Sequence, residues 1–158
     1  MANFDAKQVT PIEWAGIGAG ALAFLVSFFP WYSFSWDGAG LGIGGTSGSA
    51  SAWTIGIGGW GAVLLLVAAA VIILLPHLGT AVPNKASLWL GFAAGATVII
   101  LIRWLTLPDD GGLGELGGLA GGGFSSGAGF GLIIGLIAAI VSGVAAFLTF
   151  QGAKKATA

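Results

Sequence analysis

The chain has 158 residues, of which 56% are hydrophobic and only 7% are charged, with a mean hydropathy of +0.99 and a net charge of −1. A soluble domain of this length needs far more polar surface, and a nucleic-acid-binding protein needs a basic patch, so these values exclude both classes. The absence of cysteine excludes disulfides and thiolate metal sites.

Four apolar runs occupy more than half of the chain, and each is long enough to cross a bilayer as a helix. They cover residues 12–32, 57–75, 86–107 and 130–150. We therefore predict an all-α membrane protein in which residues 1–158 form one domain, a bundle of four transmembrane helices. The lipid bilayer is the first partner that the sequence implies.

The first predicted helix has a distinct start. Thr10 is placed to act as the N-cap, Pro11 follows at the first helical position, and Glu13 comes three residues after Thr10. This is the spacing of a capping box, in which the two side chains bond to each other's backbone N–H groups. We expect Glu13 to have this structural role.

Two glycine-rich segments, residues 33–56 and 108–129, join the helices on one side of the membrane and are predicted to be loops. Within the first of them, Ser51–Gly56 has enough strand propensity to form a small hairpin with Leu41–Gly45. Apart from this hairpin, we expect no regular structure between the helices on that side.

The candidate interaction residues lie in or beside these loops. Asp37, Asp109 and Asp110 are scattered without the spacing of a calcium-binding loop, which favours solvated charges over metal ligands. Arg103 is the one basic residue within an apolar run. Two interpretations stay open: its guanidinium extends along the helix to the membrane interface, or it pairs with one of these acids.

Small residues recur at four-residue spacing in three of the apolar runs. In lipid such residues let helix backbones approach closely and gain packing contacts, so we predict helix contact faces at these positions. Whether the faces meet within one chain or meet another protein stays open. The candidate packing residues are Gly16, Gly20, Gly91, Gly95, Gly131, Gly135, Ala139 and Gly143.

The distribution of lysine predicts the topology. All four lysines lie in segments on one side of the apolar runs, namely Lys7, Lys85, Lys154 and Lys155, whereas the glycine-rich loops contain neither lysine nor arginine. By the positive-inside rule both termini face the cytoplasm, and we expect a multi-pass protein of the plasma membrane.

The tryptophans are predicted to anchor the helices at the two membrane interfaces, where amphipathic indoles are enriched. Trp14 and Trp89 are expected at the cytoplasmic interface, and Trp31, Trp60 and Trp104 at the outer one. A lone histidine, His77, is expected to be a solvated side chain at the cytoplasmic interface.

The two halves of the chain resemble each other. Trp31 and Trp104 are each followed six residues later by Asp-Gly, and a Gly-aromatic-Gly triplet precedes or opens the next apolar run in each half. This pattern suggests two tandem helix-loop-helix repeats related by a pseudo-two-fold axis along the membrane normal. The alternative is that two glycine-rich loops match by composition alone.

In layout the whole chain resembles the small four-helix membrane proteins of unknown function that are common in actinobacteria. The features that carry the resemblance are a short N-terminal tail, the Phe29-Pro30-Trp31 end of the first apolar run and Gly/Ser-rich outer loops. The resemblance implies a plasma-membrane protein and no particular activity.

The sequence favours a non-catalytic function. No ionisable residue lies near the middle of an apolar run, and no nucleophile-base pair or ligand cluster can be assembled, so we expect no enzyme activity, no cofactor and no metal. The first hypothesis is a structural or accessory subunit that packs as a homo-oligomer or in a larger membrane complex. The alternatives are a small oligomeric transporter or channel, and a lipid-binding membrane protein.

Overall fold

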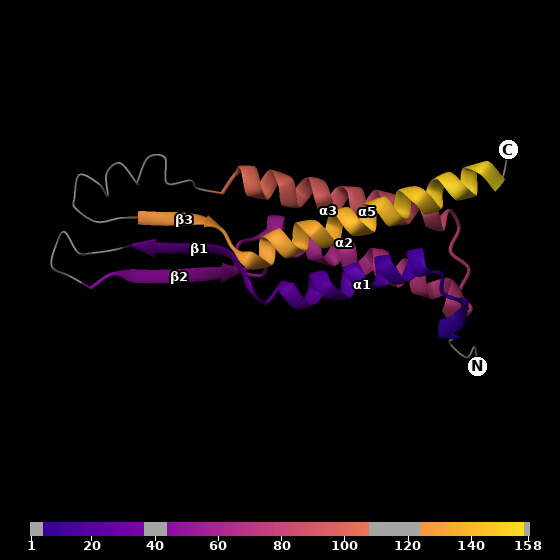
Figure 1. The fold of residues 1–158 in the computed structure, drawn as a ribbon, viewed down its shortest axis with the longest axis horizontal. Helices are drawn as coiled ribbons and strands as arrows, with labels where there is room; N and C mark the ends of the chain where they lie inside the picture. Colours follow the sequence, from indigo (N-terminus) through magenta and orange to yellow (C-terminus); the bar gives the residue numbers. More distant parts are fainter. Residues whose placement is uncertain (1–4, 37–43, 108–123, 157–158) are drawn as a thin grey trace.

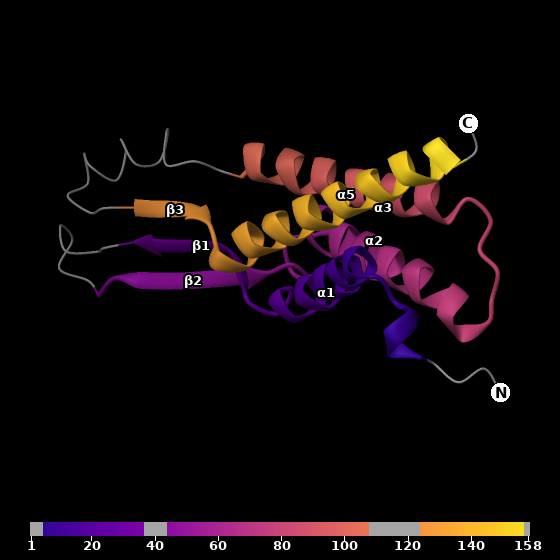
Figure 2. The ribbon, with the colours of Figure 1, turned by 45° about the vertical axis from the view of Figure 1, so that its right-hand side comes forward.

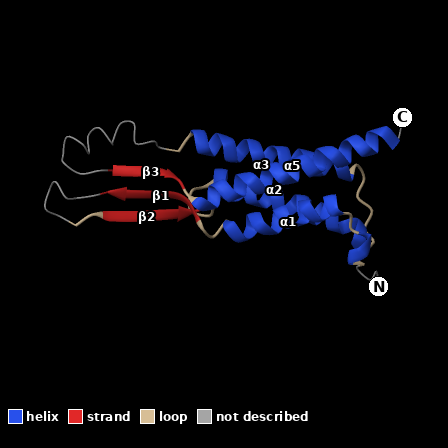
Figure 3. Cartoon of the chain, viewed as in Figure 1, coloured by secondary structure: helices blue, strands red, loops and turns tan. Residues whose placement is uncertain are grey.

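The computed structural model describes residues 5–36, 44–107 and 124–156. Four helices form a bundle, and a three-stranded sheet continues from one end of it along the same long axis (Figures 1 and 3). In chain order the elements are η1 (Ala6–Gln8), α1 (Pro11–Val26), β1 (Pro30–Trp36), β2 (Thr46–Ser51), α2 (Ile57–Leu74), η3 (Leu75–Leu78), α3 (Lys85–Leu105), β3 (Phe124–Ala128) and α5 (Phe130–Ala156).

The molecule therefore has two distinct ends, which Figure 2 shows from a second direction. We call the end that carries β1, β2 and β3 the sheet end. The opposite end, where η1, η3 and the last turns of α5 lie, is the terminal end.

Three helical segments are long and apolar enough to cross a membrane: Ile57–Leu78, Lys85–Leu105 and Phe130–Ala156. Helix α1 is also apolar but has only 16 residues, or about 24 Å, which is less than the roughly 30 Å of a bilayer's hydrocarbon core. Exposed Phe28 and Phe29 continue its apolar surface toward the sheet. The length and composition of these helices confirm the prediction of a membrane protein.

The four apolar helices agree with the predicted helical membrane protein, but the prediction of an all-α fold misses a small sheet, because the first apolar run is not one helix over residues 12–32. Helix α1 ends at Val26, and Pro30 disfavours helical backbone at the residue before it. From Trp31 to Trp36 aromatic residues and serines largely alternate, which is the two-residue period of a strand. This segment is β1.

The sheet has the order β2-β1-β3, and both pairings are antiparallel. Phe34 of β1 is aligned with Gly48 of β2 and with Ser126 of β3. The predicted hairpin was therefore wrong, because β2 covers residues 46–51 and pairs with β1, and of the predicted strand Ser51–Gly56 only Ser51 belongs to it. Of the predicted partner, residues 41–43 lie outside the described part of the chain.

The helices pack in the ring α1-α2-α3-α5, so α1 lies diagonally opposite α3. Trp89 of α3 crosses the middle of this ring and is fully buried. Its ring lies against Gly16 of α1, beside Ile73 of α2, and its indole N–H donates to Ser142 Oγ of α5 at 3.0 Å. The prediction that Trp89 anchors the helix at a membrane interface was wrong, because this side chain fills the bundle interior.

We expect Gly16→Ala to destabilise the bundle, because a Cβ atom at this position would overlap Cζ2 of Trp89 and lie 2.6 Å from Cδ1 of Ile73. Forcing an extra methyl group into a packed core costs about 1–3 kcal/mol. Thermal unfolding in detergent, followed by circular dichroism, measures this loss.

Gly18→Ala is the matched control on the same helix, since a Cβ atom there would meet nothing within 4 Å. Alanine is also the better helix former, so this variant should melt at or above the temperature of the parent chain. Equal destabilisation by both changes would contradict the packing described for Trp89.

Candidate functional site

The sheet is joined to the bundle through Trp31, the extra residue of a bulge in β1. The pairing with β2 shifts between Pro30 and Tyr32, and bulges of this kind redirect a side chain. Trp31 is fully buried, and its indole N–H donates to the carbonyl oxygen of Val26 at 3.0 Å. Trp31, near the start of β1, is thus hydrogen-bonded through its side chain to the backbone at the end of α1.

Two glycines of α5 make room for the Trp31 ring. A Cβ atom on Gly131 would lie 2.5 Å from Cδ1 of Trp31, and one on Gly135 would lie 3.0 Å from its Cζ2. Just before α5, the N–H of Gly129 donates to the carbonyl oxygen of Trp31 at 2.9 Å. Strand β1 is therefore bonded to both α1 and the start of α5.

Ser27, the residue after α1, makes a second connection between the sheet and the bundle. Its carbonyl oxygen accepts from the N–H of Ala52 at 3.1 Å, and its hydroxyl accepts from the indole N–H of Trp53 at 3.0 Å. The same hydroxyl donates to the carbonyl oxygen of Phe24. Because Ala52 and Trp53 directly follow β2, both β1 and β2 are held at the end of α1.

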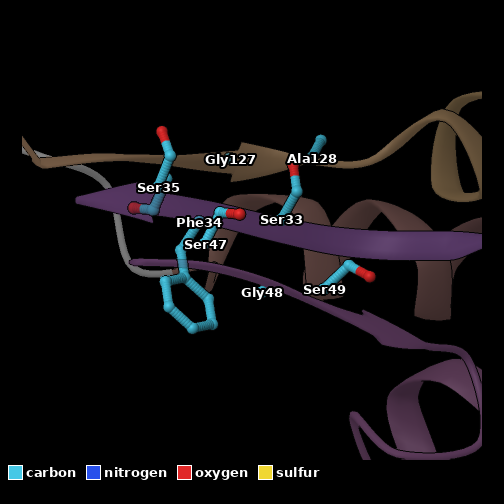
Figure 4. Close-up of a pocket in the computed structure, with 9 residues that line it drawn as sticks. Ser33, Phe34, Ser35, Ser47, Gly48, Ser49, Gly127 and Ala128 are labelled. Atoms are coloured by element: carbon cyan, nitrogen blue, oxygen red, sulfur yellow. The ribbon is translucent and has the colours of Figure 1, made fainter. Parts of the chain in front are cut away.

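The two faces of the sheet differ in chemistry. One face carries serine and glycine: Ser33 of β1 is aligned with Ser49 of β2 and with Gly127 of β3. The other face carries aromatic side chains of β1, and the ring of Phe34 covers Gly48, where a Cβ atom would lie 2.6 Å from it. Figure 4 shows the Phe34 ring and the Ser33 hydroxyl on opposite sides of β1.

A hollow of about 600 Å³ lies over the sheet and is lined mainly by serine and glycine, including Ser33, Ser35, Ser49 and Gly127 (Figure 4). Four of the five serines of β1 and β2, namely Ser33, Ser35, Ser47 and Ser49, are exposed. This face offers hydroxyl groups and no charged group, so it is suited to polar contact rather than to acid-base chemistry.

Strand β2 forms one edge of the sheet, and among the described residues no strand pairs with its outer side. Soluble and membrane proteins usually blunt such edges with lysine, proline or a bulge. The sequence of β2, Thr-Ser-Gly-Ser-Ala-Ser, contains neither lysine nor proline, and its residues 46–50 pair in regular register with β1. Within residues 5–36, 44–107 and 124–156 this edge is therefore open to another strand.

Arg103 lies in the last turn of α3, at the sheet end, where its side-chain stem packs over Gly58 near the start of α2. Its Nε atom is buried without a hydrogen-bond partner among the described residues. The side chain lines an open cavity of about 320 Å³ together with Ile55, Ile99 and Thr106. The acids that were its predicted partners, Asp37, Asp109 and Asp110, lie outside the described residues.

At the terminal end Glu13 forms the capping box that the sequence predicts, which confirms that expectation. The Thr10 hydroxyl accepts from the Glu13 N–H at 3.3 Å, and the carboxylate accepts from the Thr10 N–H at 3.0 Å. The same carboxylate forms an ion pair with Lys85 at the start of α3. Glu13 therefore joins two helices that lie diagonally across the bundle.

His77 of η3 lies beside this pair, with its Nε2 atom 3.3 Å from Oε2 of Glu13. The side chain is only 14% exposed, so the prediction of a solvated histidine was wrong. Among the described residues, no group of three or more His, Cys, Asp or Glu side chains is placed to hold a metal ion. The Glu13–Lys85 pair ties α1 to α3, and His77 of η3 lies beside it with its Nε2 atom in no hydrogen bond among the described residues.

The candidate packing residues divide into three groups. The first group, Gly20, Gly95 and Ala139, has contacts or burial within the bundle. Gly20 lies at a close approach of α1 and α2, since a Cβ atom there would be 2.6 Å from Cβ of Ala70. Gly95 has an ordinary contact with Leu65, and Ala139 is fully buried.

The second group, Gly16, Gly131 and Gly135, accommodates a tryptophan ring, and at Gly131 an added Cβ atom would also lie 2.8 Å from the Val26 carbonyl oxygen of α1. In the third group, Gly91 and Gly143 have nothing within 4 Å of an added Cβ atom. The Cβ positions of these two glycines therefore face no neighbouring described helix.

The burial of Trp31 and Trp89 was missed at the sequence level, although a signal existed for Trp31. The alternation of aromatic residues and serine from Trp31 to Trp36 indicates a strand, and a strand at this point takes Trp31 out of the first helix. Trp14 and Trp104 are 44% and 43% exposed, as expected of interface residues. Nothing in the sequence around Trp89 distinguishes it from Trp104.

No family model matches the chain, and neither a curated protein nor a solved structure matches it.

We expect Trp31→Phe to loosen the sheet from the bundle, because phenylalanine has no N–H to donate to the Val26 carbonyl oxygen. The Val26 carbonyl oxygen keeps the Phe29 N–H as a partner at 3.2 Å, so the expected cost is that of one lost hydrogen bond, about 0.5–1.5 kcal/mol. Amide hydrogen exchange of β1 should become faster, as measured by mass spectrometry. Trp104→Phe, at an exposed position of α3, is the control and should leave exchange in β1 unchanged.

We expect Lys85→Met to destabilise the chain by about 2 kcal/mol, because it leaves the buried Glu13 carboxylate without its cation. The double variant Glu13→Gln with Lys85→Met should recover much of this loss, since glutamine is uncharged and still completes a capping box. Thermal unfolding of the parent chain and of these two variants in detergent tests this. A double variant no more stable than Lys85→Met alone would show that the ion pair is not what Lys85 contributes.

Proposed function

We propose that the chain is a non-catalytic integral membrane protein, a structural or accessory subunit that packs against a second copy of itself or a larger membrane complex. The observation that carries the proposal is the open edge of β2, on a sheet bonded to the end of an apolar bundle. Edge N–H and C=O groups form a template for a strand of another chain. The bundle would hold this template at a constant position above the membrane.

The distribution of charge supports packing over catalysis or transport. In the four described helices every charged residue lies in a first or last turn: Glu13, Lys85, Arg103, Lys154 and Lys155. Proton relays and transport pathways usually place ionisable side chains near the middle of helices. Trp89 also fills the centre of the bundle, which disfavours a pore through a single chain.

For the orientation we propose that the terminal end faces the cytoplasm and that the membrane is the plasma membrane. The lysines Lys7, Lys85, Lys154 and Lys155 all belong to elements that begin or end at the terminal end (Figure 1). The positive-inside rule assigns that end to the cytoplasm. The sheet, with its serine face and its open edge, would then lie outside.

The tandem repeat stays part of this proposal. A two-fold axis along the bundle would exchange α1 with α3 and α2 with α5, and these are the diagonal pairs of the ring. Strands β2 and β3 flank β1 and lead into α2 and α5 respectively. The two halves differ at their tryptophans, because Trp31 is fully buried whereas Trp104 is exposed.

The cavity beside Arg103 favours a second candidate function, a lipid-binding membrane protein or a small oligomeric transporter. A buried guanidinium nitrogen at the edge of an open cavity is suited to an anionic group at the membrane surface. Flux or lipid binding in liposomes that is lost on Arg103→Ala would favour this function over the accessory one.

The absence of cysteine makes the edge of β2 directly testable. We expect Ser49→Cys, on this exposed strand, to form crosslinked adducts in the native membrane when the thiol carries a short maleimide-diazirine reagent, because irradiation releases N2 and the resulting carbene inserts into whatever chain is docked at the edge. Gel electrophoresis and mass spectrometry identify the adducts.

Thr80→Cys is the control, since Thr80 is exposed at the terminal end and far from the sheet. It should give much less product than Ser49→Cys under the same conditions. Only monomer from Ser49→Cys, or equal products from both positions, would contradict docking at the sheet.

A further inference from the structure

We infer that the surface between α1 and α5 at the terminal end binds one acyl chain of an anionic phospholipid, with Lys155 contacting the headgroup. This site is separate from the sheet and from the cavity beside Arg103. It is independent of the accessory function proposed above.

The site is an apolar groove of about 410 Å³ between two helices that pack directly against each other. Ala15 of α1 and Ala145 of α5 form its floor, because their small side chains leave space between the helices. The walls include Ile12, Val141 and Val144, which are 40%, 44% and 55% exposed. The volume lies within the range of sites that bind small molecules.

The occupant of such a groove in a membrane-crossing bundle is hydrocarbon. Its lining is almost entirely apolar, and the helices that form it include α5, one of the segments long enough to cross a membrane. A second helix is about 10–12 Å across and would lie over the groove without reaching its alanine floor. A single acyl chain is much thinner and can lie along the alanine floor.

The charge at the end of the groove selects the headgroup. Leu148 lines the groove near the terminal end, and Lys155 follows it by seven residues, which is about two turns on the same helix face. The rise over seven residues is about 10 Å, so the ammonium group lies just beyond the apolar part. Lys155 is exposed and can reach a phosphate group at the interface.

The nearby acidic groups do not cancel this charge. The Glu13 carboxylate is paired with Lys85 and accepts the Thr10 N–H of the capping box, so it is bonded within the bundle. Asp5 accepts from the backbone N–H of Lys7 within its own turn. The groove therefore ends at a cation, which matches an apolar tail followed by an anionic headgroup.

Spin-labelled phospholipids test this inference on the full chain reconstituted in vesicles. Electron paramagnetic resonance separates lipid that is immobilised on the protein from lipid of the bulk membrane. We expect more immobilised phosphatidylglycerol than phosphatidylcholine with the same labelled chain. Lys155→Gln should lower this preference about five-fold, the effect of roughly 1 kcal/mol per lysine, and Lys155→Arg should keep it.

Two variants fill the groove from opposite walls. Ala15→Leu fills it from α1, and Val144→Trp fills it from α5 at a half-exposed position where folding is little affected. Both should remove the immobilised signal at this site for either lipid. Ala21→Leu, at an exposed position of α1 outside the groove, is the control and should leave the signal unchanged.

Three results would overturn the inference. The first is an immobilised fraction that stays at the parent level in both Ala15→Leu and Val144→Trp. The second is an equal preference for the two lipids in the parent chain. The third is efficient disulfide dimerisation of Val144→Cys in the membrane, which would show that a second copy, rather than a lipid, covers the groove.

Discussion

The hydrogen bond from the Trp31 indole to the carbonyl oxygen of Val26 is the interaction on which the shape of the molecule depends. It closes the end of α1 at the point where the chain changes from helix to strand. The indole needs this acceptor because its N–H is buried in an apolar environment. The Trp31 ring needs Gly131 and Gly135 of α5, so one side chain couples the sheet to the first and last helices.

Trp89 has the corresponding role nearer the terminal end. It donates to Ser142 and lies on Gly16, and thus connects three helices through the centre of the ring. Where lipid surrounds a bundle, the hydrophobic effect does not hold helices together, and packing and buried hydrogen bonds have to do so. Two tryptophans inside and an ion pair between Glu13 and Lys85 at the terminal end supply these contacts. The interior of the bundle is consequently filled by side chains.

The sequence predicts the helices well because length and apolarity alone determine which segments cross a bilayer. It predicts the capping box of Glu13 because that motif is local. It does not predict the ion pair with Lys85, which joins residues 72 positions apart and depends on the bundle's diagonal geometry. The sheet was missed because the apolar run continued through Phe29 and Pro30, so that hydropathy hid the change to a two-residue period after Trp31.

The same reasoning explains why the candidate interaction residues could be placed only in part. Arg103 has a defined position beside Gly58, whereas its acidic candidate partners fall outside the described residues. Glycine spacing indicates close packing but does not name the neighbour, and at Gly16 and Gly131 the neighbour is an indole ring. A four-residue repeat of small residues is therefore compatible with several kinds of contact, and only the fold distinguishes them.

The central claim, that this bundle supports a docking element in an assembly, is tested most directly by native mass spectrometry of the protein extracted gently from its own membrane. If the sheet docks in an assembly, the spectrum will show a fixed homo-oligomer or a reproducible complex with another membrane protein. A chain that is released only as a monomer, with no protein partner at any detergent concentration, would contradict it.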